Sequence, residues 1–349
     1  MQASLTKKAA KVKSHVFVKG ICILCLASLA AVLYDNVAYV SADLKTLNNM
    51  SGDANSKDMP RSQKIAATKI VDCAELVAES AAKEGKDFLF VTTKTRVAYK
   101  MSIYPPEKDV FVSKEILEKG CWECDIVERA LRALDENKSR GAYLLDIGGN
   151  IGQVSLASAA AGHEVYTFEP VKSNYEHICR SIRQNRFEKR VTIFNRALAS
   201  KPSVVQFTSA GKNFGGIAVR ESKEASGRQG VDYAYAAVID RLRDILPDKS
   251  KPVVLKVDIE GREMDALVGA AKFLREREII HAFMELRLSV LIQETSKTDL
   301  VFSILRSKGL KPYQSVAGKL QALDPDWHTW QNAYSLQRVA LFDVSWKKD

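Results

Sequence analysis

Residues 144–152 read Leu-Leu-Asp-Ile-Gly-Gly-Asn-Ile-Gly, and this stretch decides the fold class that the rest of the sequence then supports. An apolar run contains Asp146 near its end, glycines follow, and a helical pattern begins at Gly152. Glycines let a backbone turn tightly and approach a ligand closely, and the acid can accept hydrogen bonds from a cationic or hydroxyl-bearing ligand. The stretch therefore predicts a strand, a turn and a helix that together bind a nucleotide-type cofactor.

Strand-like and helix-like patterns alternate after this stretch. The predicted strands are 143–147, 164–168, 191–195, 253–257 and 278–284, with a last apolar run at 339–344. The predicted helices are 152–161, 172–185, one that begins at Arg262, and 297–308. Residues 204–208 and 217–220 predict an inserted hairpin, with 233–238 as a candidate third strand. This alternation predicts a parallel α/β sheet covered by helices on both faces.

The first 40 residues predict a membrane anchor. Five lysines and no acid precede the apolar segment 20–34, which is near the lower limit for spanning a bilayer. The cationic flank fits a single-pass signal anchor with the body of the protein in the lumen of the endoplasmic reticulum or Golgi. Val40-Ser41-Ala42 resembles a cleavage site, so secretion after signal cleavage is the alternative.

Between anchor and sheet we expect two further parts. Residues 41–65 are polar and predict a stem or linker, and 66–140 predict a small α+β cap before the domain at 141–349. Cys121-Trp122-Glu123-Cys124 has the spacing of a redox or zinc half-site, but the sequence has no second half-site, so zinc is not expected. In an oxidising lumen a disulfide among Cys73, Cys121 and Cys124 is plausible, with buried thiols as the alternative.

Polar residues follow or end the central predicted strands. These residues are Asp146, Glu169, Asn195, Asp258 and Glu285. A single acid at a strand end is common as a helix cap, whereas five polar residues in one sheet are harder to attribute to chance. Ligands of open α/β sheets bind at the carboxyl ends of the strands, so these positions predict a ligand site.

The positions of the acids favour one class of cofactor. Glu169 lies 23 residues after Asp146 and suits a ribose diol. Asp146 at the first strand tip would repel a pyrophosphate, but it suits a ligand with a cationic centre and an amino acid end. This favours S-adenosylmethionine over NAD.

Five segments together resemble the FkbM-type methyltransferases. They are residues 144–152, 166–170 (YTFEP), 195–200 (NRALAS), 255–270 (LKVDIEGREMDALVGA) and 283–286 (FMEL). The resemblance spans about residues 120–345 and implies an S-adenosylmethionine-dependent enzyme with a seven-stranded Rossmann-like sheet. Gly149 stands where the family often has alanine, which is a mild departure.

The resemblance also implies the cofactor contacts. The residues implied to line the methionine end are Asp146, Gly148, Asn150 and Gly152. Those implied to lie near the ribose and the adenine are Glu169, Asn195 and Ala197. Asp258 is implied to border both the sulfonium and the acceptor. Asn195 as a turn residue and Ala197 as a packing residue are the alternatives.

Transfer to an oxygen needs a base for the acceptor hydroxyl, and the candidates are Asp258, Glu260 and Glu285. Glu260 could instead face the N-terminus of the next helix, and Glu263 could do likewise. No metal is expected. His281 lies inside a predicted strand and is expected to be a core residue.

We expect the acceptor to be a hydroxyl of a glycan or a small molecule. Nucleic acid is not expected, because the lysines and arginines behind the net charge of +10 are scattered along the chain. The oligomeric state stays open. Two other functions remain as alternatives, namely a non-catalytic Rossmann-like binding module and an NAD-dependent oxidoreductase.

Overall fold

The computed structural model describes residues 70–80, 88–207, 219–222, 232–242, 245–316, 319–330 and 341–349. The predicted anchor at 1–40 and stem at 41–65 lie outside these residues. Within the described ranges, no helix is both long and apolar enough to cross a membrane.

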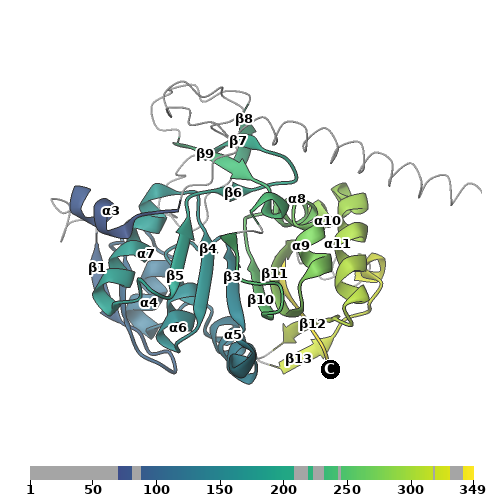
Figure 1. The fold of residues 1–349 in the computed structure, drawn as a ribbon, viewed down its shortest axis with the longest axis horizontal. Helices are drawn as coiled ribbons and strands as arrows, with labels where there is room; N and C mark the ends of the chain where they lie inside the picture. Colours follow the sequence, from purple (N-terminus) through teal and green to yellow (C-terminus); the bar gives the residue numbers. More distant parts are fainter. Residues whose placement is uncertain are drawn as a thin grey trace, which may run out of the picture. The chain divides into compact units, whose positions relative to one another are not determined.

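One large sheet of eight strands carries the fold, in the order β13-β12-β14-β11-β10-β3-β4-β5 (Figure 1). Its strands are β3 (Tyr143–Ile147), β4 (Glu164–Phe168), β5 (Val191–Phe194), β10 (Val253–Val257), β11 (Ile279–Arg287), β12 (Lys311–Val316), β13 (Lys319–Ala322) and β14 (Leu341–Lys347). The first five are parallel to one another, and β14, β12 and β13 pair antiparallel. The predicted α/β class is confirmed, with eight strands in a mixed sheet rather than seven.

The strands absent from the sequence prediction are β12 and β13, which form a hairpin at one edge of the sheet. Most side chains of β12 are only half-buried, and β13 is largely exposed. Edge strands of this kind carry little apolar alternation, and Pro312 further weakens the strand signal.

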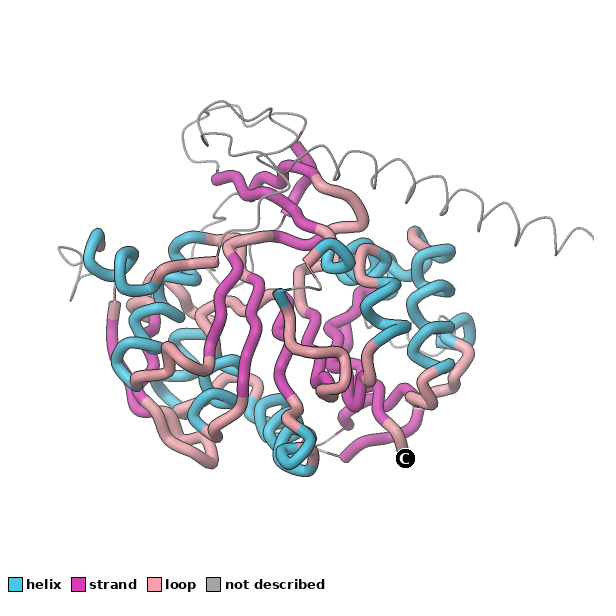
Figure 2. The backbone as a smooth tube through the Cα atoms, in the orientation of Figure 1, coloured by secondary structure: helices cyan, strands magenta, loops and turns pink. Residues whose placement is uncertain are grey.

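Helices cover both faces of the sheet (Figure 2). They are α5 (Cys124–Glu136), α6 (Gln153–Ala160), α7 (Lys172–Asn185), α8 (Glu263–Val268), α9 (Ala271–Glu276), α10 (Leu288–Gln293) and α11 (Thr295–Ser307). Leu145 and Leu255 pack in the core with α8 to α11, whereas Leu144 and Val254 pack in the core with α5 to α7. Side chains alternate between faces along a strand, so Asp146 and Lys256 lie on the α5–α7 side.

An N-terminal segment packs against the β5 edge and α7. It contains α3 (Cys73–Glu79), β1 (Leu89–Thr92), β2 (Lys100–Ile103) and α4 (Val112–Lys119). Ile70 bridges Phe194 of β5, and a disulfide joins Cys73 to Cys179 of α7. A second disulfide joins Cys121 and Cys124. Cys179 is thus a partner outside the predicted set of Cys73, Cys121 and Cys124.

A smaller sheet in the order β6-β9-β7-β8 follows β5 in the chain. Its strands are β6 (Ala197–Leu198), β7 (Ser203–Phe207), β8 (Val219–Ser222) and β9 (Asp232–Ala237). The predicted hairpin and its candidate third strand are thereby confirmed. Three short 3-10 helices complete the described elements, namely η2 (Lys138–Arg140), η3 (Ile239–Arg241) and η5 (Trp327–Thr329).

Candidate active site

The glycine loop after β3 is held between β4 and the segment after β10. Gly148 and Gly149 both donate their N–H groups to the carbonyl of Phe168, at 2.9 and 3.1 Å. Gly148 has φ +87°, and a Cβ at this position would lie 1.8 Å from the carbonyl oxygen of Asp258. No side chain fits such a gap, so glycine is required where the two segments meet.

Asp146 is buried at the end of β3, with 1% of its surface exposed. Its Oδ2 accepts a hydrogen bond of 2.6 Å from Ser155 of α6. Its Oδ1 accepts no hydrogen bond from the described residues and lies 3.6 Å from Nζ of Lys256. Burial raises the pKa of Asp146, while Lys256 and Ser155 act in the opposite direction.

Glu169 follows β4 and fastens the same loop. Its two carboxylate oxygens accept the N–H groups of Asn150, at 2.8 Å, and Val171, at 2.9 Å. Burial raises the pKa of Glu169 to about 7, and these two N–H donors oppose the rise. The Oδ1 of Asn150 is itself buried and accepts no hydrogen bond from the described residues.

Asn195 and Ala197 lie at the carboxyl end of β5 and the start of β6. The Oδ1 of Asn195 accepts a hydrogen bond of 2.7 Å from Arg196. Ala197 pairs with Ala236 of β9. Both are half-buried next to the loop edge of the sheet.

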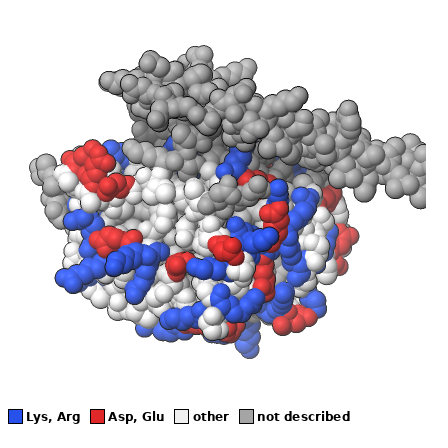
Figure 3. All heavy atoms as spheres, in the orientation of Figure 1, with Lys and Arg blue, Asp and Glu red and all other residues white. Residues whose placement is uncertain are grey.

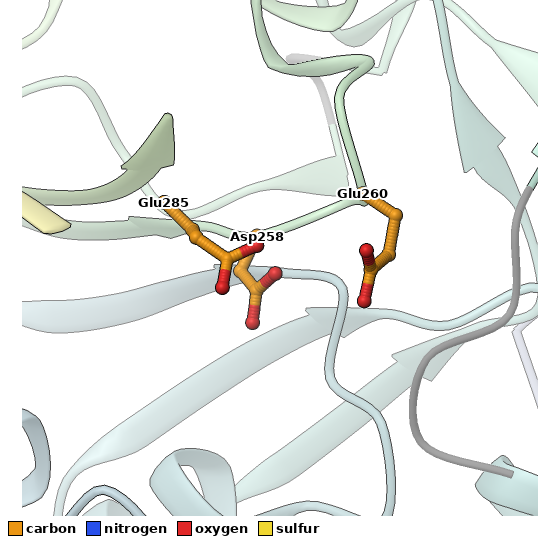
Figure 4. Close-up of side chains that lie close together, drawn as sticks. All are labelled: Asp258, Glu260 and Glu285. Atoms are coloured by element: carbon orange, nitrogen blue, oxygen red, sulfur yellow. The ribbon is translucent and has the colours of Figure 1, made fainter. Parts of the chain in front are cut away.

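The three candidate bases come together at the carboxyl ends of β10 and β11. Figure 4 shows the carboxylates of Glu285 and Asp258 side by side, with Glu260 beyond them. One oxygen of each lies within 4.8 Å of the others. The Nζ of Lys256 lies 3.3 Å from Oδ2 of Asp258, and Arg287 forms an ion pair with Glu260. These cations already supply positive charge to the cluster, and we assign no metal to it.

The turn after β10 separates two alternatives that the sequence left open. Glu263 accepts the N–H groups of Ile259 and Gly261, at 3.0 and 2.9 Å. Glu260 has φ +58° and its side chain pairs with Arg287 instead. Glu263 therefore stabilises the turn, and Glu260 stays with the carboxylate cluster.

A small pocket opens beside this cluster, under the N-terminal end of α5. Its charged lining residues are Glu123, Arg129, Lys256, Asp258, Glu285 and Asp343. Burial raises the pKa of Glu285 to about 8, and the neighbouring Asp258 and Glu260 add to the rise. Burial also raises the pKa of Glu123 to about 7 and that of Asp343 to about 6. The pocket can therefore take up a proton near neutral pH.

Three residues of the pocket are additional to those predicted from the sequence, namely Glu123, Lys256 and Asp343. Lysine inside the apolar strand 253–257 was a usable signal, because a buried ammonium needs anionic partners. Asp343 had no such signal, since β14 reaches the site only by pairing with β11. His281, expected in the core, is 7% exposed and stacks on Phe283 at 4.0 Å.

Comparison with known proteins identifies the domain around this site. Residues 146–311 match the sequence profile of the methyltransferase FkbM domain. This part of the chain is thus similar to the methyltransferase FkbM domain. No curated protein sequence matches the chain.

Several solved structures are similar at low identity. A SAM-dependent methyltransferase from Agrobacterium tumefaciens is 10% identical, with a TM-score of 0.39, covering 75% of this chain and 71% of that one. Precorrin-6y C5,15-methyltransferase from Geobacter metallireducens is 12% identical, with a TM-score of 0.34, covering 70% and 100%. Magnesium protoporphyrin IX methyltransferase from Synechocystis with bound SAM is 10% identical, with a TM-score of 0.33, covering 64% and 78%. The FkbM family match, rather than these structures, therefore carries the assignment.

S-adenosylmethionine is the cofactor of FkbM methyltransferases, and the residues around the glycine loop fit it. Asp146 Oδ1 and Asn150 Oδ1 are buried acceptors that lack hydrogen bonds from the described residues, and the cofactor carries ammonium and hydroxyl donors. Anionic groups at the site also suit a ligand with a cationic sulfonium.

Proposed function

We propose that this protein is an FkbM-type methyltransferase that transfers a methyl group to a hydroxyl oxygen of a glycan or a small molecule. The observation that carries the proposal is the pocket of carboxyl groups, two of whose lining residues, Lys256 and Asp258, contact Gly148 of the glycine loop. When bound, S-adenosylmethionine supplies an electrophilic methyl group on a sulfonium. The chain must then hold the acceptor hydroxyl in line with that methyl group and remove its proton.

The loop residues would hold the cofactor. Asp146 and Asn150 offer unsatisfied acceptor oxygens. Glu169 Oε1 accepts hydrogen bonds from the Val171 N–H and the Asn174 amide, whereas Oε2 accepts only the Asn150 N–H among the described residues and keeps a further lone pair for a ribose hydroxyl.

Two carboxyl groups are candidates for the base. Glu285 has a pKa raised to about 8, which is close to the range in which a general base works best at neutral pH. Asp258 lies beside it and is bound by Lys256. We propose that Glu285 accepts the proton and that Asp258 orients the hydroxyl, with Glu260 adding negative charge.

The charges around the pocket support a neutral acceptor. Four carboxyl groups and two cationic groups line it, so an anionic acceptor such as a nucleic acid backbone would meet repulsion. On the face of the molecule in Figure 3, basic and acidic side chains are interspersed over the described surface. This distribution also argues against a nucleic acid as the acceptor.

Equilibrium titration with S-adenosylmethionine tests the cofactor part of the proposal. We expect the wild-type protein to bind it, and Asp146→Ala to bind at least about tenfold more weakly, because a buried acceptor is lost. NAD serves as the control ligand. Binding of NAD but not of S-adenosylmethionine would favour the oxidoreductase alternative.

Transfer and location need separate assays. The protein is incubated with methyl-labelled cofactor and with glycan, lipid and small-molecule fractions of cells. Binding without label in any fraction would favour the non-catalytic alternative, and label only in protein or nucleic acid would refute the acceptor class.

We also propose that residues 20–34 anchor the body in the lumen. Digestion of the body by protease in intact vesicles would contradict that orientation.

A further inference from the structure

Lys256 is a buried lysine in the middle of the site. Its side chain is 8% exposed. On β10 it is the direct partner of Asp146 on β3 and of Phe283 on β11. Burying an ammonium costs several kcal/mol unless anionic or carbonyl groups surround it, so its contacts are informative.

The ammonium contacts three groups that belong to different parts of the site. Its Nζ donates to the carbonyl of Gly148 at 3.0 Å and to Asp258 Oδ2 at 3.3 Å. Asp146 Oδ1 lies 3.6 Å away. Two of the three donor hydrogens of the ammonium therefore go to Gly148 and Asp258, and its contact with Asp146 is an ion pair without a hydrogen bond. The glycine loop, the end of β3 and the acceptor pocket are therefore joined through a single atom.

We propose that Lys256 is a positioning residue that couples the cofactor loop to Asp258, the carboxylate that orients the acceptor hydroxyl. The inference rests on the proposed function. Lys256 fixes the Gly148 carbonyl on one side and the Asp258 carboxylate on the other. The loop that would hold the methyl donor and the carboxylate that would orient the acceptor hydroxyl are thereby linked through the same ammonium.

The charges around Lys256 are strongly unbalanced. Carboxyl groups approach Lys256 from the loops before α5 and after β4 and from the ends of β3, β10, β11 and β14. They are Glu123, Asp146, Glu169, Asp258, Glu260, Glu285 and Asp343. The other nearby cations are Arg129 and Arg287, of which Arg129 pairs with Asp125 and Arg287 with Glu260. Burial alone would lower the pKa of Lys256, but Asp258, Asp146 and Glu123 together raise it, so it remains charged.

A lysine that served only stability would behave differently from a positioning residue. Its loss would lower the free energy of unfolding but leave cofactor binding and its pH dependence unchanged in the folded fraction. Loss of a positioning cation would weaken binding in folded protein. It would also raise the pKa of Asp146 further, so that the carboxylate needed for binding would become protonated at a higher pH.

The test is titration of the full chain with S-adenosylmethionine between pH 5 and 9, with folding checked by circular dichroism. We expect the Lys256→Met variant to bind S-adenosylmethionine about tenfold more weakly at pH 7. As the pH is lowered, it should lose binding at a midpoint about one pH unit higher than that of the wild type. Lys256→Arg keeps the charge and should keep the pH midpoint, with weaker binding because the longer side chain displaces Gly148. Lys251→Met is the matched control, since Lys251 is half-buried and pairs with Glu164 at the opposite end of β4 from the site.

Each outcome decides the proposal. A folded Lys256→Met variant that binds S-adenosylmethionine with the wild-type affinity and the wild-type pH midpoint would overturn the proposal. If Lys256→Met does not fold, Lys256→Gln replaces it and the same two outcomes apply. A wild-type protein that does not bind S-adenosylmethionine would refute the proposed function and this inference with it. Wild-type binding combined with an unaffected Lys256 variant would refute this inference alone.

Discussion

At the residue scale, Gly148 offers the most direct test of the loop geometry. Gly148→Ala places a methyl group 1.8 Å from the Asp258 carbonyl oxygen and strains a backbone with φ +87°. We expect unfolding to become easier by about 2–4 kcal/mol and S-adenosylmethionine binding to be lost. Gly309→Ala is the matched control, because Gly309 has φ +76° and open space around it. It should cost about 1 kcal/mol and leave binding intact. Equal effects of the two variants in urea denaturation would contradict the steric argument.

Glu285 gives a pH prediction with a defined sign. Its pKa in the folded state is about 8, whereas an exposed glutamate has a pKa near 4.3. Between these values the folded protein holds a proton that the unfolded chain has released, so the free energy of unfolding falls as pH rises from about 4.5 to 8. Glu285→Gln stays neutral and should stabilise the protein by about 1–2 kcal/mol at pH 8 but little at pH 5. Glu118→Gln is the control, because the Glu118 side chain on α4 is exposed. A stability loss at pH 8 in Glu285→Gln would refute the prediction.

Some site residues were visible in the sequence and others were not. Asp146, Asp258 and Glu285 could be found because parallel strands deliver their carboxyl ends to one edge. Asp343 arrives from an antiparallel strand whose register against β11 the sequence does not encode locally. The carboxylate of Glu169 accepts hydrogen bonds from backbone N–H groups. Every residue except proline has such a group, so the sequence could not indicate these partners.

At the element scale, the Cys73–Cys179 disulfide fixes α3 to α7 across 106 residues of sequence. A cross-link over a loop of this length restricts the unfolded chain by about 4–5 kcal/mol in the chain-entropy view. We expect the Cys73→Ala/Cys179→Ala double variant to lose about 2–5 kcal/mol of stability, measured by urea denaturation. The Cys121–Cys124 disulfide closes a far shorter loop. The Cys121→Ala/Cys124→Ala variant should therefore lose about half as much stability as the first variant, or less. The opposite order would show that α3 is not anchored as described.

The elements themselves were predictable where the local pattern was strong. Strands β3, β4 and β10 and helix α7 have the predicted bounds, since each is an uninterrupted apolar or amphipathic segment. Strands β12 and β13 were missed. Their stability comes from tertiary contacts, namely the pairing of β12 with β14, which residue spacing does not record.

At the scale of the whole molecule, residues 61–349 form one compact unit that contains both disulfides and every site residue discussed above. A fragment of residues 61–349 should therefore unfold in one transition at the same midpoint as the full chain, because every core cluster of the described residues lies within it. It should also bind S-adenosylmethionine within about twofold of the full-chain affinity. A shorter fragment of residues 104–349 is the informative comparison, since it removes Cys73 and the β1–β2 hairpin that pack against α7. That fragment should melt earlier. Weaker binding by residues 61–349 than by the full chain would show that the N-terminal 60 residues contribute to the site.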